Sequence, residues 1–129
     1  LCEEGSLKLK EISYINSSAF ASGELKHGTI SLIEKDTPVM GIITDDNLAL
    51  KTISNIKEVH ARGAYSLFIT SLDIDGDFYD DKIKVPHINN YIDPILIVAS
   101  LQLLAYNVAL LKGEDIDKPR NLAKSVTVE

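Results

Sequence analysis

The 129-residue sequence has little cysteine, since Cys2 is the only one it contains. A single thiol can form neither an internal disulfide nor a thiolate metal cage, and it fits a reducing, cytoplasmic setting. Basic charge is scarce too, because 13 lysines and arginines stand against 19 acidic residues, for a net charge of -6. Such a chain offers no basic field for a phosphate backbone, so we expect no nucleic-acid partner.

The motifs of metal and nucleotide chemistry are also missing. The three histidines stand without metal-ligand spacing, and neither HExxH nor CxxC occurs. Residues 73–81, "DIDGDFYDD", begin like a calcium loop, but Phe78 stands where glycine is needed and Lys84 where glutamate is needed. No glycine-rich phosphate loop or dinucleotide fingerprint is present. We therefore expect no metal and no cofactor.

Long hydrophobic runs are few, and residues 95–111 form the one that resembles a membrane span. The run is shorter than ~20 residues and contains Ser100, Gln102 and Asn107, so we expect a core helix packed against a sheet and no membrane. No basic start followed by an apolar run is visible, which argues against a signal peptide. The first residue is Leu1 and not methionine, and we expect the chain to be part of a longer protein.

What is present is an ordinary globular composition and a length typical of one domain. Apolar residues spaced by three and four predict helices over 7–22, 46–62 and 93–112, the last with Asp93 as its cap. Short apolar, β-branched runs predict strands over 38–44, 65–70 and 82–88. Continuous apolar strands in this order predict an α/β fold with a mostly parallel sheet.

Glu11 is the first of three candidates for chemistry. On the predicted helix it stands one turn from Leu7 and Ile15, where a carboxylate among apolar neighbours could act as a general base. The plainer alternative is a carboxylate at the rim of the protein, paired with Lys8.

His27 and Lys124 are the other two candidates. His27 lies in "GELKHG" (23–28), where glycines let the backbone turn sharply and a histidine could move protons near neutral pH; it could equally be an ordinary loop histidine. Lys124 could attack a carbonyl carbon if apolar neighbours such as Ala123 and Val126 desolvate it. A lysine in a C-terminal tail is more commonly solvated.

Four segments of the sequence resemble the glutamine–fructose-6-phosphate amidotransferase family: "LKLKEISYI" (7–15), "GELKHG" (23–28), "LQLLAYNVALLKG" (101–113) and "PRNLAKSVTVE" (119–129). The last eleven residues are the most specific part. The resemblance identifies residues 1–118 as the second SIS (sugar isomerase) domain of the isomerase portion. It implies a three-layer α/β/α sandwich of the Rossmann or flavodoxin type, with residues 119–129 as a tail that closes over the active site.

The resemblance also implies a reaction, in which L-glutamine and fructose 6-phosphate give glucosamine 6-phosphate and glutamate, leading into amino-sugar synthesis. It implies that Lys124 forms a Schiff base with the C2 ketone of the sugar. By the same resemblance, Glu11 moves a proton between C1 and C2, and His27 takes part in ring opening within the active site of the neighbouring subunit.

Further positions gain roles from the same resemblance. Lys8 and Ala123 would contact the sugar, and Arg120, Ala123 and Val126 would help to wall an apolar ammonia channel that disfavours water and ammonium.

The implied partners are fructose 6-phosphate, glucosamine 6-phosphate, a preceding SIS domain, an N-terminal glutaminase domain of the same chain, and a second subunit in a homodimer. Because the phosphate-binding loops and the glutamine-hydrolysing cysteine of the family lie in those other domains, we expect these 129 residues alone to be inactive. Two alternatives remain: a non-catalytic SIS module that binds a sugar phosphate to regulate a partner, and a sugar-phosphate isomerase without amide transfer.

Overall fold

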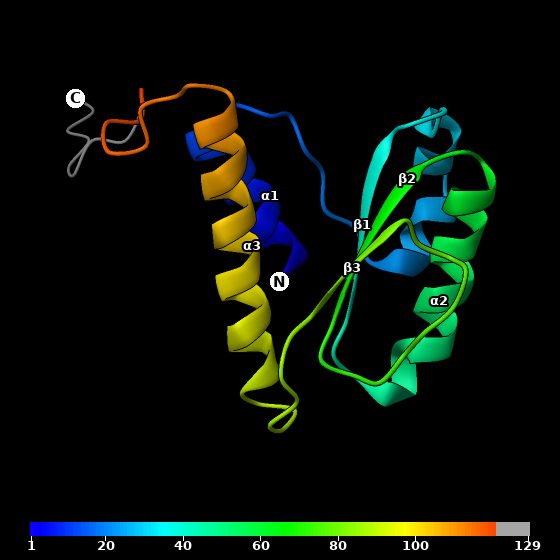
Figure 1. Cartoon of the computed structure of the whole chain (residues 1–129). Helices are drawn as coiled ribbons and strands as arrows, with labels where there is room; N and C mark the ends of the chain where they lie inside the picture. The colour runs from blue at the N-terminus through cyan, green and yellow to red at the C-terminus, as the bar shows by residue number, and fades with distance from the viewer. Residues whose placement is uncertain (121–129) are drawn as a thin grey trace, which may run out of the picture. The chain divides into compact units, whose positions relative to one another are not determined.

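The structure, a computed structural model, describes residues 1–120. Its elements follow the predicted order of helices and strands (Figure 1): α1 (Cys2–Ser13), the 3-10 helices η1 (Ser22–Lys26) and η2 (Thr29–Leu32), β1 (Pro38–Ile43), α2 (Asp46–Ala61), β2 (Tyr65–Thr70), β3 (Asp81–Lys84) and α3 (Asp93–Leu111). They form two compact units. The first unit combines Leu1–Ala19 with the chain from Val98 onward, and the second unit is Phe20–Ile97.

The second unit is built on a parallel sheet in the order β1-β2-β3. Pro38 is in register with Tyr65 at the start of the β1–β2 ladder, and Thr70 with Lys84 at the end of the β2–β3 ladder. The predicted α/β class with a parallel sheet is therefore confirmed. Parallel strands need a crossover between them, and α2 supplies it from β1 to β2.

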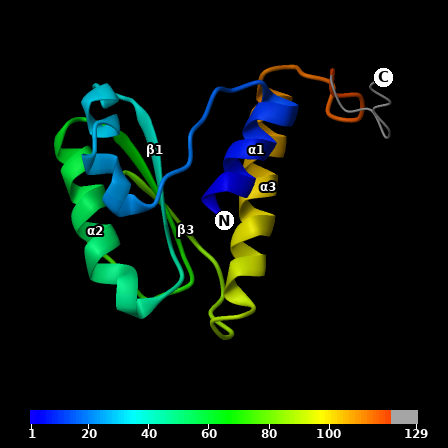
Figure 2. The ribbon, with the colours of Figure 1, turned by 180° about the vertical axis from the view of Figure 1, so that it is seen from behind.

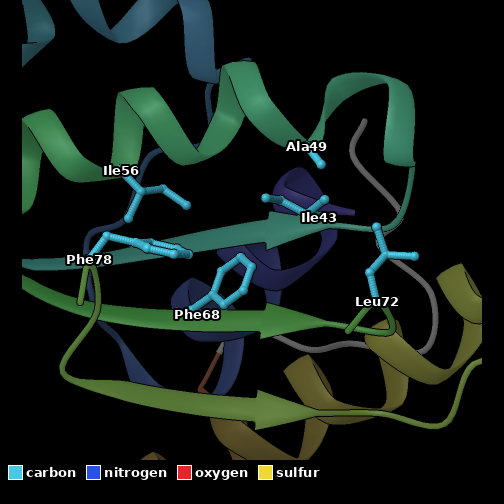
Figure 3. Packing of buried hydrophobic residues seen from close by; sticks show 6 residues of the cluster. All are labelled: Ile43, Ala49, Ile56, Phe68, Leu72 and Phe78. Carbon is cyan, nitrogen blue, oxygen red and sulfur yellow. The ribbon is translucent and has the colours of Figure 1, made fainter. Parts of the chain in front are cut away.

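Apolar side chains from α2, from β1 and β2, and from the loop between β2 and β3 meet to form the core of the second unit (Figure 3), which contains Ile43, Ala49, Ile56, Phe68, Leu72 and Phe78. The Phe68 and Phe78 rings pack edge to face, with centroids 5.4 Å apart. Gly41 allows α2 to approach β1, because a Cβ there would lie 2.2 Å from Cδ1 of Ile56. These contacts fix the sheet against α2.

The helix predicted over 46–62 matches α2 at its start and is one residue too long at its end. Asp45 precedes the helix, and its Oδ1 accepts a hydrogen bond from the Asn47 N–H at 2.9 Å, which satisfies a free donor of the first turn. Gly63 follows the helix with a φ of 92°, a left-handed conformation that glycine adopts without strain.

The first unit contains α1 and the part of α3 from Val98 onward, and the two helices lie side by side in both views (Figures 1 and 2). The Ser13 hydroxyl donates to the Ala105 carbonyl at 2.8 Å. Near the other end of α1, Gly5 leaves space for Leu101, since a Cβ there would lie 3.1 Å from Leu101 Cδ2. Small residues and a buried hydroxyl thus bring the two backbones together.

The predicted helix over 7–22 is wrong in both bounds, because α1 starts at Cys2 and ends at Ser13. Tyr14 ends it in the left-handed conformation, with φ 53° and ψ 36°. Serine side chains compete with the helix in this stretch: the Ser17 hydroxyl lies 2.9 Å from that of Ser6 and donates to the Ser6 carbonyl at 3.0 Å. Ile15 consequently lies outside the helix, so Glu11 is not one helical turn from it.

The strand predicted over 82–88 is shorter and ends at Lys84. The Val85 N–H still donates to the Thr70 carbonyl at 3.0 Å, but Pro86 has no N–H with which to continue the ladder. The prediction of Asp93 as a cap is also wrong. It is the first residue of α3, and its carboxylate accepts from the backbone N–H groups of Ile88 and Asn89 in the preceding loop, at 2.8 and 3.1 Å.

The helix α3 is less buried than a core helix should be. One stripe is buried, consisting of Ile97, Leu101, Ala105 and Ala109, while Ile95, Leu103, Tyr106 and Leu110 are exposed. Within residues 1–120, α3 is also the helix whose length and composition would suit a membrane span. Its sequence is hydrophobic all round, a pattern typical of helices that are covered on every face, and among residues 1–120 one stripe is buried.

Candidate functional site

Lys8 and Glu11 form an ion pair on the exposed side of α1, in the first unit. Lys8 Nζ lies 2.7 Å from Glu11 Oε2, and both side chains are about 30% exposed, at 30% and 28%. The hydrogen bond to Glu11 raises the pKa of Lys8, so the ammonium stays protonated at neutral pH. The pairing considered from the sequence is confirmed. Among the described residues the contact engages one carboxylate oxygen, and the other could accept a proton from a ligand.

The chain after α3 returns to the end of α1. Lys112 Nζ donates to the Ser13 carbonyl, and the Arg120 N–H donates to the Tyr14 hydroxyl at 2.8 Å. The Arg120 guanidinium lies 4.3 Å from the centre of the Tyr14 ring, and its Nη2 lies 3.1 Å from Glu114 Oε2. Arg120, in the described part of the tail, is therefore bound to Tyr14, which follows Glu11 by three residues.

Sequence reasoning missed the contact of Tyr14 with Arg120. The two residues are 106 positions apart, and nothing in the local pattern around either of them indicates the other. The signal that could have drawn attention to Tyr14 is the serine- and asparagine-rich stretch after it, which indicates that the helix ends there.

His27 lies in the second unit, where η1 ends. Its N–H donates to the Glu24 carbonyl at 3.0 Å, and the side chain is exposed. Gly28 has a φ of 122°, so the sharp turn expected from the glycines is present. Lys26 pairs with Glu58 of α2 at 2.8 Å and fixes η1 to that helix.

The predicted site residues thus fall into three places. Lys8, Glu11 and Arg120 are in the first unit, and His27 is in the second. Lys124, Ala123 and Val126 lie outside the described residues.

The acidic segment is engaged by lysines. Asp75 pairs with Lys82, which lowers the pKa of the carboxyl, and Asp73 pairs with Lys84. Lys84 is the residue that stands in place of the calcium-binding glutamate. Within residues 1–120, no group of three or more histidine, cysteine or acidic side chains could hold a metal ion.

Comparison with known proteins gives a family and several near relatives. The family model of the SIS domain matches residues 1–112. A protein of Bacillus subtilis named glutamine–fructose-6-phosphate aminotransferase (isomerizing) is 53% identical over all 129 residues, and one of Halalkalibacterium halodurans with the same name is 50% identical. The chain spans 21% of each, about a fifth of the length of these relatives.

Solved structures agree in fold. The C-terminal domain of glucosamine-fructose-6-phosphate aminotransferase from Francisella tularensis has a TM-score of 0.80 and 39% identity, over 88% of this chain and 33% of that one. Glucosamine-6-phosphate deaminase from Thermotoga maritima has a TM-score of 0.70 and 26% identity, over 95% of this chain and 35% of that one.

Proposed function

This chain belongs to the SIS domain family, and from that premise we propose that it is the isomerase part of an amidotransferase that makes glucosamine 6-phosphate from fructose 6-phosphate and glutamine-derived ammonia. The observation that carries the proposal is the 53% identity, over all 129 residues, to a relative named for this reaction. The SIS domain and the α/β fold that the four sequence segments imply agree with the family model and with the solved structures. The remaining four fifths of such a protein would supply the glutaminase domain, the preceding SIS domain and, with a second copy, the homodimer.

In the proposed reaction the neutral amine of Lys124 attacks C2 of open-chain fructose 6-phosphate, and water leaves as the imine forms. Ammonia then replaces the lysine amine at C2. Glu11 takes a proton from C1 and returns one to C2, while the proton of the C1 hydroxyl moves to the imine nitrogen, so that the C2 imine becomes a 2-amino aldehyde. His27 is proposed to assist the ring opening that precedes these steps.

The Lys8–Glu11 pair supports the proton-transfer role. A charged Lys8 holds one carboxylate oxygen of Glu11 by a hydrogen bond of 2.7 Å, which orients the other oxygen. The partial exposure of both side chains leaves them accessible to a sugar. Lys8 would also contact the sugar hydroxyls, as would Ala123.

The tail is proposed to have a second duty in the same protein. Arg120, Ala123 and Val126 would help to wall a channel for ammonia, as part of the segment 119–129 that closes over the active site. The guanidinium of Arg120 is engaged by Glu114 and Tyr14, so its contribution would come from its backbone and from its place at the root of the tail.

Borohydride trapping in the full-length protein tests the proposal. We expect fructose 6-phosphate to be trapped on the peptide that contains Lys124, and we expect Lys124→Arg to abolish the adduct because a guanidinium forms no imine here. Lys118→Arg, a matched change at an exposed lysine near the root of the tail, should leave the adduct intact. An equal yield of adduct in Lys124→Arg would show that the Schiff-base role is wrong.

Assays of the full-length protein also distinguish the two alternative functions. A regulatory SIS module would bind the sugar phosphate without any adduct, and a plain isomerase would form product without nitrogen from labelled glutamine. Glu11→Gln should still form the adduct but should slow glucosamine 6-phosphate formation about 10²- to 10⁴-fold, the usual contribution of a general base.

A further inference from the structure

Tyr14 adopts a backbone conformation that favours glycine and asparagine. With φ 53° and ψ 36° it is one of two non-glycine residues with positive φ among the described residues, the other being Asp36. Helices commonly end in this conformation, but usually with glycine, because a side chain there is strained. A tyrosine at this position needs contacts that compensate for the strain.

Those contacts come from the chain after α3. The Tyr14 hydroxyl accepts the Arg120 N–H at 2.8 Å, and the ring lies 4.3 Å from the guanidinium. Glu114 Oε2 lies 3.1 Å from Nη2 of the same guanidinium. One side chain therefore binds both the backbone and the charged group of Arg120.

Other contacts lead the chain to this point. Lys112 donates to the carbonyl of Ser13, next to Tyr14, and Asp115 accepts the backbone N–H groups of Asp117 and Lys118, both at 3.1 Å. The segment from Lys112 to Arg120 is thus turned back onto the end of α1 by charged and backbone groups.

We propose that Tyr14 is a positioning residue that fixes the root of the C-terminal tail beside Glu11. Arg120 precedes Lys124 by four residues, and Tyr14 follows Glu11 by three. The contact therefore ties Arg120, where the described part of the tail ends, to the end of the helix that carries Glu11. This role rests on the proposed function, but the contact itself is testable without it.

Three variants of the full-length protein separate the parts of the contact. Tyr14→Phe removes the hydroxyl and keeps the ring. Tyr14→Asn removes both while keeping a residue that tolerates the left-handed conformation, so that a loss cannot be assigned to the backbone. Tyr91→Phe is the matched control, because that side chain is 89% exposed.

The first measurement needs no activity. Since proline follows Lys118, trypsin makes its first cut in the tail after Arg120, and mass spectrometry measures the rate of that cut. We expect Tyr14→Asn to speed it about tenfold and Tyr14→Phe about threefold, as the loss of a cation–π contact and one hydrogen bond predicts. Tyr91→Phe should cut at the wild-type rate.

The second measurement is the rate of borohydride-trapped adduct on Lys124 with fructose 6-phosphate. We expect Tyr14→Asn to slow adduct formation about tenfold and to lower kcat, with KM for fructose 6-phosphate changed by less than about twofold, because the lost interaction positions a group that acts in the chemical step. A general loss of folding would instead lower the adduct rate and kcat in proportion to the folded fraction. Circular dichroism on the same samples measures that fraction.

The outcomes are distinct. Cutting and trapping rates in Tyr14→Asn within twofold of wild type would overturn the proposal. Absence of an adduct in the wild-type protein would overturn the proposed function, and the trypsin rates would still decide whether Tyr14 holds Arg120. If Tyr14→Asn does not fold, the cutting and trapping rates of Tyr14→Phe are compared with those of the wild type, with a smaller expected change.

Discussion

The interior of each unit of this protein is stabilised by a different kind of interaction. In the second unit, aromatic and branched side chains fill the space between α2 and the sheet, as Phe68, Phe78 and Ile56 show. In the first unit, hydrogen bonds such as that of the Ser13 hydroxyl to the Ala105 carbonyl join two helices at small residues. Apolar burial gives the second unit a core of its own, whereas the first leaves apolar side chains of α3 exposed.

Most of the described candidate residues lie in the first unit, outside the apolar core of the second. The first unit carries Lys8, Glu11 and the root of the tail, and it is joined by polar contacts that are individually weak. The second unit contributes His27, on a turn tied to α2. Lys8, Glu11 and His27 are thus not members of the apolar core of the second unit. Residues that act on substrates commonly stand outside such cores, on loops and near chain ends.

The largest expected effect is in the core of the second unit. Phe68→Ala should lower the free energy of unfolding by about 3–5 kcal/mol, because Phe68 is fully buried and packs against two other aromatic rings. Urea unfolding measures the change. Leu50→Ala on the exposed face of α2 is the control and should stay within about 0.5 kcal/mol. Equal losses in the two variants would contradict the core assigned to this unit.

A second prediction concerns the buried carboxylate of Asp93, at the edge of the second unit. Burial alone would raise its pKa. The Ser71 hydroxyl, the N–H groups of Ile88 and Asn89, and the ring of His87, whose Nδ1 lies 2.6 Å away, instead hold the pKa well below the usual range. A carboxyl whose pKa is lowered on folding stabilises the protein above its unfolded pKa of about 4, and this stabilisation is lost as the pH falls through the folded pKa.

Asp93→Asn should therefore lower the urea midpoint most at pH 7, and the difference from wild type should shrink between about pH 5 and pH 3. Asp46→Asn, an exposed acid in the first turn of α2, serves as the control for loss of one charge. A difference that grows towards acid pH would mean that the Asp93 carboxylate is not stabilised as an anion.

The smallest expected effect concerns the hydrogen bond between α1 and α3 in the first unit. Ser13→Ala removes the buried hydrogen bond to Ala105 and should cost about 1 kcal/mol of unfolding free energy. Ser18→Ala, at an exposed serine, should be neutral. If Ser13→Ala were as costly as Phe68→Ala, the contrast between a hydrogen-bonded unit and an apolar unit would not hold.

Much of the fold could be predicted because its causes are local. The apolar stripe of α2 lies within its 16 residues, and Asp45 and Gly63 stand close to its two ends. The strand predicted over 65–70 matches β2 in both bounds. Gly28, directly after His27, predicts a sharp turn from its residue type alone, and its φ is 122°. The spacing of Lys8 and Glu11 on a helix suffices to predict their pairing.

The candidate site was less accessible to such reasoning. Lys124 drew attention through resemblance, since local rules make a lysine in a tail a solvated group, and it lies outside the described residues. The division between residues 1–118 and 119–129, the homodimer and a cytoplasmic location stay predictions.

The sequence by itself determined the α/β class, the order of the elements and the local pairs and turns, because these depend on residues a few positions apart. The tertiary structure decided where α1 ends, which stripe of α3 is buried, and which way the Asp93 carboxylate faces. It also decided that Tyr14 meets Arg120. Such contacts join residues whose separation along the chain carries no periodicity, so only the packed chain brings their groups within bonding distance.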